Sequence, residues 1–394
     1  MKRIALFILY VFTLSGLFAD YGAAVKVELD AAGQDEAEVI GNIIIAPWYS
    51  VPFDKSELYI SAGINTSFGD RSYFAPELFR LEYSFWRSDM ISFRVGRMSW
   101  QDTSGFIARG RFDGADAQFD LGSIRLGANL LYTGFLFRET AYVNVSPQDT
   151  KDYGETLKWS EFGDTYFAPR RLLASVYGQF PGLPFGRGQL YAGLLVQFDL
   201  SGADEAFHTQ YLTLRHTLVF GAFDVEAAGA VELENTDAEG TRAALAFFVE
   251  GGYQLPFAMK DRLSLGLGWA SGDGNGLAAF FPITLEAQSF VLRPAFSGIM
   301  LIRANYHARI LSSLSADLGA HYFFRTDSDS FSAAYLKNDS YALGMELNTS
   351  AVWVPFSDLL VSLKGGVFMP KTGAAWEKDA PVMWRITVGA GFYF

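Results

Sequence analysis

The sequence contains no cysteine, so neither a disulfide framework nor a thiolate metal site can form. Its histidines, His208, His216, His307 and His321, lack the spacing of metal ligands. No P-loop motif occurs and no Ser/His/acid arrangement stands out, so nucleotide hydrolysis and triad catalysis have no support. We therefore expect a protein that is not an enzyme and that uses no metal or cofactor.

The chain also lacks an excess of positive charge, since its formal net charge is −12. Proteins that bind nucleic acid carry a basic patch or stripe, and none is present here, so we expect no nucleic-acid partner. After residue 19, no uncharged apolar run approaches the roughly 20 residues that a membrane-spanning helix needs. If the chain crosses a membrane, it must do so with strands.

The first residues have a different character. Lys2 and Arg3 form a short basic region, Ile4 to Phe18 form an apolar run, and Ala19 can serve as the cleavage residue. The run is too short for a spanning helix, and no cysteine follows it that could carry a lipid anchor. We expect residues 1–19 to be a cleaved signal peptide that sends residues 20–394 across the inner membrane.

Aromatic residues are abundant: 16% of the chain is aromatic, with 36 Phe and 19 Tyr, although charges are scattered along its whole length. This composition suits strands with one face toward lipid and the other toward water. The C-terminal segment shows the pattern. From Val382 to Phe394 the even positions are apolar or small, whereas the odd positions include Arg385, Thr387 and Tyr393. A side-chain period of two is typical of a β-strand between two environments.

Similar alternation recurs throughout the chain and predicts its fold. Candidate strands begin near residues 22, 38, 57, 77, 90, 110, 124, 170, 188, 208, 223, 241, 261, 297, 313, 340, 358 and 382. Most are long enough for the roughly 9–11 residues with which a tilted strand crosses a bilayer. We therefore expect an all-β fold, a transmembrane antiparallel up-and-down β-barrel of about 18 strands (16–18). The stretch Thr284–Val291 could hold a further strand, and irregular alternation near Arg97 and from His208 to Phe220 predicts bulges.

The lengths of the connections predict the orientation of the barrel. With both termini periplasmic, the two longest connections, about 139–169 and 271–296, become external loops. Four short connections on the other side carry a Pro-Phe pair: Pro52-Phe53, Pro184-Phe185, Pro256-Phe257 and Pro355-Phe356. Proline cannot donate to a ladder, so it ends strand pairing at the barrel rim.

Charged residues on the inward faces form a ladder of mixed sign. The pore-lining candidates are Arg80, Arg94, Arg125, Arg303, Arg385, Lys364, Asp317, Glu346 and Glu250. Further members of the ladder are Arg111, Arg171, Arg242, Glu82, Asp116, Asp120, Glu226 and Glu232. They could form a constriction that selects solutes by charge and size, or pair across strands and keep the wall rigid. Some passage for water and solute is expected, because about 18 strands enclose more space than side chains fill.

Several short motifs resemble those of the alginate-export family of outer-membrane porins. They are Gly268–Asn275 followed by Phe280-Phe281-Pro282, Val95-Gly96-Arg97 with Arg111–Gly114, Leu343–Leu347, and Gly365–Pro370. The resemblance implies an 18-stranded export barrel. Members of the family are similar in having an electropositive pore for a polyuronate, whereas this ladder is mixed, so alginate is not carried over as the solute. C-terminal aromatic residues such as Phe392 and Phe394 resemble the signal read by the barrel-assembly machinery.

The leading functional hypothesis is an outer-membrane porin or exporter that gives passive passage to small polar or oligosaccharide-like solutes. The alternative is a surface adhesion or structural barrel whose pore is closed or gated. A transporter with an N-terminal plug is disfavoured, since strand-like sequence begins almost directly after the signal peptide. The expected partners are outer-membrane lipid, the assembly machinery and a small polar solute.

Overall fold

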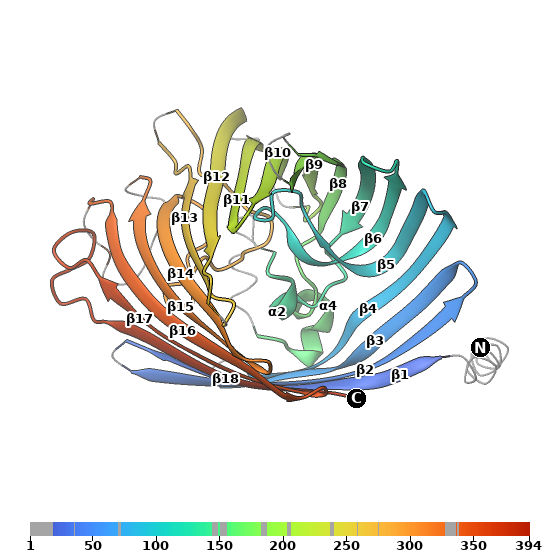
Figure 1. Cartoon of the computed structure of the whole chain (residues 1–394), viewed down its shortest axis with the longest axis horizontal. Helices are drawn as coiled ribbons and strands as arrows, with labels where there is room; N and C mark the ends of the chain where they lie inside the picture. The colour runs from blue at the N-terminus through green and yellow to red at the C-terminus, as the bar shows by residue number, and fades with distance from the viewer. Residues whose placement is uncertain are drawn as a thin grey trace.

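The computed structural model of the chain describes residues 19–394 except 35, 70–71, 144–148, 150–155, 183–186, 203–205, 237–239, 258, 275, 328–335 and 337–338. The predicted signal peptide thus lies almost wholly outside the described residues. The described residues form one sheet of 18 antiparallel strands, which closes into a barrel because β18 pairs with β1 as well as with β17 (Figure 1). The predicted up-and-down barrel is confirmed.

Every strand begins within a few residues of its predicted start. The strands are β1 (Asp20–Gly33), β2 (Ala37–Phe53), β3 (Ser56–Phe68), β4 (Tyr73–Ser88), β5 (Ile91–Gln101), β6 (Arg109–Asp120), β7 (Arg125–Tyr132), β8 (Arg171–Pro181), β9 (Arg187–Asp199), β10 (Phe207–Phe220), β11 (Phe223–Thr236), β12 (Gly240–Gln254), β13 (Arg262–Ala270), β14 (Ile299–Leu311), β15 (Leu314–Arg325), β16 (Ala342–Phe356), β17 (Leu359–Pro370) and β18 (Met383–Tyr393).

Short helical segments occur in the connection between β7 and β8. They are α2 (Arg138–Ala141), η1 (Trp159–Glu161) and α4 (Phe162–Thr165). Both α2 and α4 lie within the ring of strands (Figure 1). The possible extra strand Thr284–Val291 is instead part of the β13–β14 connection, where Thr284 makes only an isolated bridge to Val143. In the part of the chain that the structure describes, no helix has the length and hydropathy needed to cross a bilayer.

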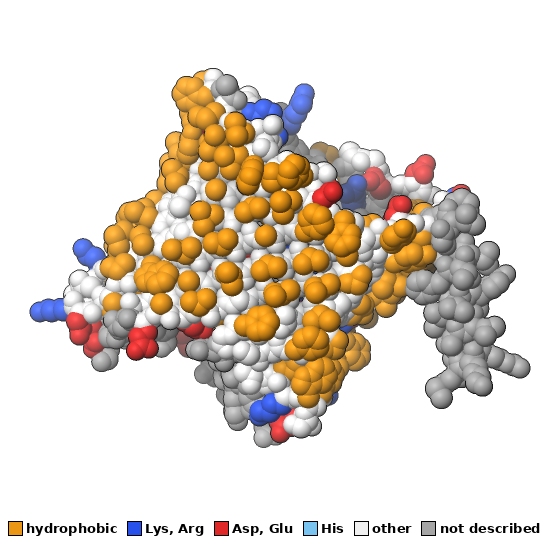
Figure 2. All heavy atoms as spheres, turned by 90° about the horizontal axis from the view of Figure 1, so that it is seen from below, with side chains coloured by type: hydrophobic (Ala, Val, Ile, Leu, Met, Phe, Trp, Pro, Cys, Tyr) orange, Lys and Arg blue, Asp and Glu red, His pale blue; other side chains and the backbone are white. Residues whose placement is uncertain are grey.

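The strands divide their side chains between two faces, as the alternation predicted. Outward residues such as Ile302, Leu318 and Val388 are 47–56% exposed, although they are fully apolar. Seen from below, hydrophobic side chains cover the wall and charged ones gather at its margins (Figure 2). In water, such a surface would cost roughly 25 cal/mol for each Å² of apolar area, whereas lipid removes that cost. The outer wall is therefore built for a bilayer.

The two ends of the barrel differ in their connections. One end, here called the turn end, carries the start of β1, the C-terminus and the short connections between even- and odd-numbered strands. The other end, the loop end, carries the long connections 133–170 and 271–298. Three of the four Pro-Phe pairs lie at the turn end, with Phe53, Phe257 and Phe356 exposed. The fourth, Pro184-Phe185, lies outside the described residues.

One of the two predicted bulges is wrong and the other is displaced. Strand β10 pairs without a register shift with both β9 and β11, so the bulge predicted from His208 to Phe220 is absent. Near Arg97, the irregularity lies on the neighbouring strand, where the pairing of β3 with β4 skips Phe79. Gly96 has a φ of +116°, and a Cβ there would lie 2.0 Å from the Leu81 carbonyl oxygen, so a side chain cannot be placed at this position.

Candidate pore

Inward arginines are matched with carboxylates along the barrel wall. The closest approaches are 3.0 Å for Arg80–Glu82, Arg94–Asp116 and Arg125–Asp120, and 2.7 Å for Arg303–Glu250. Arg385 Nε donates to Asp30 Oδ1 at 2.8 Å across the β1–β18 seam. The predicted cross-strand pairing is therefore present at Arg94, Arg125, Arg303 and Arg385, whereas Arg80 pairs with Glu82 on its own strand, and these pairs neutralise most of the charge locally.

Most of these arginines also lie against an aromatic ring. The guanidinium carbon of Arg303 is 4.3 Å from the centre of the Phe248 ring, and that of Arg80 is 4.5 Å from the Tyr59 ring. Arg385 lies 5.6 Å from the Phe290 ring. A cation held between a carboxylate and a ring loses much of its rotamer freedom. Arg80, Arg303 and Arg385 are thus each restrained by two contacts.

The remaining pore-lining candidates have three different surroundings. Asp317 Oδ1 lies 2.7 Å from His307 Nδ1, and Asp317 Oδ2 accepts a 2.9 Å bond from Ser350 Oγ. Lys364 is exposed and has no ion-pair partner among the described residues. Glu346 is fully buried. Its two oxygens accept backbone N–H bonds from Phe290 at 2.9 Å and Leu292 at 3.0 Å, so this carboxylate contacts a loop rather than open water.

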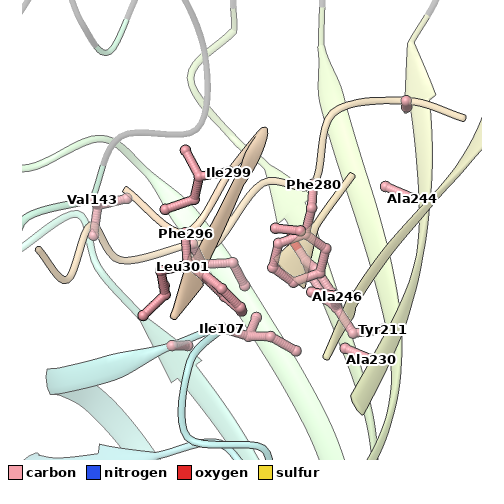
Figure 3. Packing of buried hydrophobic residues seen from close by; sticks show 14 of the residues in the cluster. Ile107, Val143, Tyr211, Ala230, Ala244, Ala246, Phe280, Phe296, Ile299 and Leu301 are labelled. Carbon is pink, nitrogen blue, oxygen red and sulfur yellow. The ribbon is translucent and has the colours of Figure 1, made fainter. Parts of the chain in front are cut away.

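The connections of the loop end fold into the barrel and pack there. Ile107, Val143, Phe280, Ile283 and Phe296 come from three different connections, and all five are buried. Figure 3 shows four of them, Ile107, Val143, Phe280 and Phe296. All five pack with strand residues such as Tyr211 and Leu301, and together they are called the loop core here. The Phe296 ring lies 5.1 Å from that of Phe106. The loop end is therefore filled like the interior of a globular protein.

Buried carboxylates hold the 271–298 connection against the wall. Besides Glu346 on β16, Glu232 on β11 is fully buried and accepts a 2.8 Å bond from the backbone N–H of Phe281. Thr284 Oγ1 accepts a 2.8 Å bond from the backbone N–H of Arg109. A carboxylate that accepts backbone N–H groups forms a charge-assisted bond, which is stronger than a neutral one.

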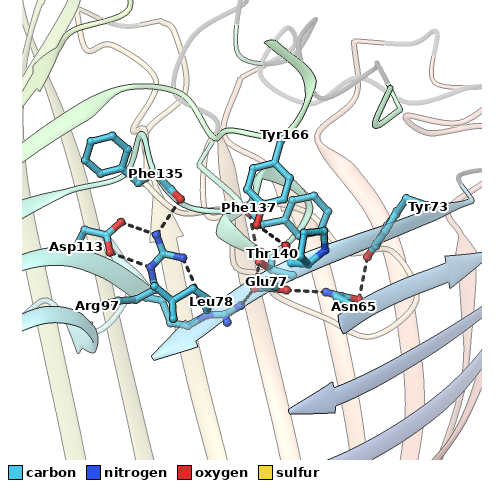
Figure 4. A network of polar contacts seen from close by, with 12 residues as sticks. Asn65, Tyr73, Glu77, Leu78, Arg97, Asp113, Phe135, Phe137, Thr140 and Tyr166 are labelled. Carbon is cyan, nitrogen blue, oxygen red and sulfur yellow. Dashed lines mark hydrogen bonds and ion pairs between the residues drawn. The ribbon is translucent and has the colours of Figure 1, made fainter. Parts of the chain in front are cut away.

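A second network ties the β7–β8 connection to β4 and β5 (Figure 4). Glu77 accepts bonds from Asn65 Nδ2 at 2.9 Å and Thr140 Oγ1 at 2.7 Å. Arg97 pairs with Asp113 at 2.7 Å and donates to the Phe135 carbonyl oxygen at 2.8 Å. Our sequence reasoning singled out neither Glu77 nor Arg97 as a site residue. The sequence feature that could have identified these two residues is a charge on the inward face of a strand next to a long connection.

Two ionisable groups of the connections have shifted pKa values. Burial raises the pKa of Tyr166 to about 12, so its hydroxyl stays protonated and donates a 2.6 Å bond to the Pro76 carbonyl oxygen. Burial also lowers the pKa of Arg293, and the charge of Arg385 nearby adds to this effect. A guanidinium nevertheless stays charged at neutral pH, so Arg293 brings a second cation next to Arg385.

A cavity of about 360 Å³ with both polar and apolar lining lies in the wall between β5 and β10. Its lining includes Arg94, Gln101, Tyr177 and Arg215. A second cavity of about 340 Å³ lies nearer the turn end and shares Arg125 and Gln179 with the first. Throughout the described residues, no three His, Asp or Glu side chains are grouped as ligands for a metal ion.

The sequence matches no known family model and none of the curated proteins. Solved structures of Pseudomonas aeruginosa proteins are similar over nearly the whole chain. OccK11 (OpdR) has a TM-score of 0.62 at 12% identity, covering 95% of this chain and 96% of its own. OccK2 (OpdF) in complex with glucuronate has a TM-score of 0.59 at 12% identity, covering 95% and 98%. OprD has a TM-score of 0.57 at 14% identity, covering 95% of both chains.

Sequence identities of 12–14% are too low to transfer a substrate or a mechanism. The TM-scores of 0.57–0.62 over nearly the whole chain establish a shared architecture. In this chain, that architecture is a closed barrel of 18 antiparallel strands with an apolar outer wall. The coarser part of the family resemblance, a porin barrel, is confirmed, whereas the similar structures do not support the alginate-export family in particular. The chain has the fold of an 18-stranded outer-membrane porin.

Proposed function

We propose that this protein is an outer-membrane porin that gives passive passage to small polar or oligosaccharide-like solutes. The observation that carries the proposal is the contrast between the two faces of one closed sheet. The outer wall is apolar, whereas the inner wall holds ion pairs such as Arg303–Glu250 with the arginine side chain 28% exposed. A polar inner wall costs several kcal/mol per unpaired group unless water reaches it, so it is typical of a hydrated path.

The solved structures that are similar support a small polar solute. One of them, OccK2, holds glucuronate, a carboxylated sugar. This chain offers hydroxyl, amide and guanidinium groups along its inner wall, which can replace the water around a sugar-sized solute. The proposal includes no catalytic step.

Planar-bilayer conductance of the purified, refolded barrel tests the proposal. Stable, ohmic single-channel current is the expected result. Folding should be checked independently by the shift in gel mobility between heated and unheated samples. A correctly folded barrel that stays electrically silent at every applied potential would contradict the porin function.

The alternative is a surface adhesion or structural barrel with a closed or gated pore. The loop core favours it, since Phe280 and Ile283 are fully buried inside the ring. A silent barrel whose loop-end segments bind a surface ligand would support this alternative. A conducting barrel would exclude a permanently closed pore.

Membership of the alginate-export family rests on the short motifs alone. We infer that a polyuronate is not the solute, because the arginines that could attract it are already paired with carboxylates such as Asp30 and Asp116. Added alginate should leave the current unchanged at concentrations where neutral sugars alter it.

The remaining expected partners are lipid and the barrel-assembly machinery. Phe392 and Phe394 are 46% and 63% exposed at the turn end, where an assembly factor can reach them. We expect that deletion of Phe394 lowers the amount of barrel in the outer membrane several-fold, while barrel that does assemble unfolds at nearly the wild-type denaturant concentration. The same removal of an aromatic side chain in Phe356→Ala serves as the control. Unchanged assembly after deletion of Phe394 would refute the signal.

A further inference from the structure

The two cavities of the barrel wall adjoin each other, and their lining is both polar and apolar. They share Arg125 and Gln179, and together they extend from the β5–β6 connection toward the turn at Gly122 and Ser123. This feature is called the wall groove here. Its two parts, about 360 and 340 Å³, each lie within the roughly 300–1,000 Å³ typical of small-molecule sites. The groove is therefore large enough for more than one small ring.

Every arginine of the wall groove is already matched by a carboxylate. Arg94 lies 3.0 Å from Asp116, Arg125 lies 3.0 Å from Asp120, and Arg215 lies 3.1 Å from Glu226. A carboxylated solute would find no cation in the groove that lacks a counter-ion among the described residues. It would also lose its hydration on entry, so its carboxylate would contribute little binding free energy in the groove.

Of the two carboxylates that line the groove, Asp120 pairs with Arg125, and Asp102 is satisfied by hydrogen bonds. Its oxygens accept backbone N–H bonds from Ile107 and Ala108 at 3.0 Å and from Ser104 at 2.7 Å. These bonds fold the β5–β6 connection inward, where the hydroxyls of Thr103 and Thr213 bond to each other across the top of the groove. A cationic solute thus gains little from Asp102.

The remaining polar side chains that line the groove are uncharged and can form hydrogen bonds. Within the described residues, the side-chain amides of Gln101 and Gln179 have no hydrogen-bond partner, although both line the groove. An amide can donate and accept at once, which is what a hydroxyl group also does. Tyr177 and Tyr191 add flat rings next to these polar groups, so the groove has both apolar faces and hydrogen-bonding edges.

We propose that the wall groove binds a short uncharged oligosaccharide. A sugar chain presents hydroxyls at its edges and C–H groups on its ring faces, and the amides and tyrosines of the groove match both. Unused guanidinium N–H groups of the paired arginines can donate to sugar hydroxyls without a net charge on the solute. The inference deepens the proposed porin function, since it names the solute class that the wall would hold during passage.

The test uses two probes, maltotriose and glucuronate, and two readouts. Interruptions of single-channel current report binding during passage. Quenching of tryptophan fluorescence in the detergent-solubilised barrel reports binding without passage, because Trp100 lines the groove, and the Trp100→Phe variant identifies its contribution. We expect maltotriose to give both signals and to bind more tightly than glucuronate. Gln101→Leu and Gln179→Leu should each weaken maltotriose about 3- to 10-fold, since each removes hydrogen bonds of ordinary strength.

Gln288→Leu is the matched control, because Gln288 lies on the 271–298 connection and lines neither part of the groove. It should bind maltotriose like the wild type. Tighter binding of glucuronate, or equal weakening by all three glutamine variants, would overturn the inference. Current without any sugar effect would overturn it while leaving the porin function intact. Quenching by maltotriose in a barrel that carries no current would support the groove and contradict the porin function.

Discussion

At the turn end of the barrel, Phe257 and Phe356 are 60% and 71% exposed, whereas at the loop end Phe280 and Trp376 are completely buried. The same residue types therefore meet lipid or headgroups at one end and a packed protein interior at the other. Connection length contributes to the difference, since a two-residue turn such as 357–358 cannot reach back into the barrel, whereas connections such as 271–298 and 371–382 can. An 18-stranded barrel of this kind combines an open scaffold with a small globular core.

The sharpest test of this comparison asks which end faces the outside of the cell. Single cysteines placed at Glu161 and Glu286 should react with an impermeant thiol reagent on intact cells, and cysteines at Lys55, Arg187 and Asp358 should not. The background is clean because the chain has no native cysteine. Reaction at Lys55 in intact cells, with an unrelated periplasmic cysteine silent, would invert the orientation.

A second test removes one aromatic ring from each end. We expect Phe280→Ala to destabilise the loop core by about 3–5 kcal/mol, as is usual for a buried phenylalanine. Phe257→Ala should stay within roughly 0.5 kcal/mol, because an exposed side chain loses few contacts. Denaturant unfolding in lipid vesicles, followed by hydrogen exchange of the 271–298 amides, measures both. Similar losses of stability in the two variants would show that the aromatic side chains at the two ends are packed alike.

A third test concerns the carboxylates that anchor the connection. Glu346→Ala leaves the backbone N–H groups of Phe290 and Leu292 without their acceptor, at a cost of about 1–3 kcal/mol for each buried group. Faster hydrogen exchange at these two amides and larger current fluctuations are expected. Glu286→Ala, which removes an exposed carboxylate from the same connection, provides the comparison. Unchanged exchange in Glu346→Ala would show that the loop core alone holds the connection.

The smallest expected effect concerns ion selectivity. Arg303→Glu changes one side chain from +1 to −1 next to Glu250, so the reversal potential should shift toward cation preference. The shift should be modest, because the Debye length at physiological salt is about 8 Å and many other pairs line the wall. Outward Leu318→Ser should leave the reversal potential where it is. An Arg303→Glu channel with wild-type selectivity would assign this arginine to the rigidity of the wall.

The sequence was sufficient to predict the strands of the barrel wall but not the packing of the connections inside the barrel. Strand starts could be placed because apolar side chains recur at every second position of a strand, as Leu318 and Ile386 illustrate on the outer face. The surroundings of Glu346 could not be read in this way. Its inward position was clear, but its burial depends on Phe290 and Leu292, which reach it from more than 50 residues away. Long connections carry no periodic signal, so their packing is decided by tertiary contacts alone.

The closure of the barrel has a consequence for how the chain must fold. Asp30 on the first strand accepts bonds from Arg385 and Thr387 on the last, with more than 350 residues between them. Such a contact forms late, because its loop-closure entropy is the largest in the molecule. Until then β1 and β18 are unpaired edges, open to association with other chains. A slip of one residue at this seam would turn the inward residues of one strand, Asp30 or Arg385, toward lipid. The buried ion pair therefore permits one register only. Closure of the barrel, the final step of folding, succeeds only if all the preceding strand pairs are in register.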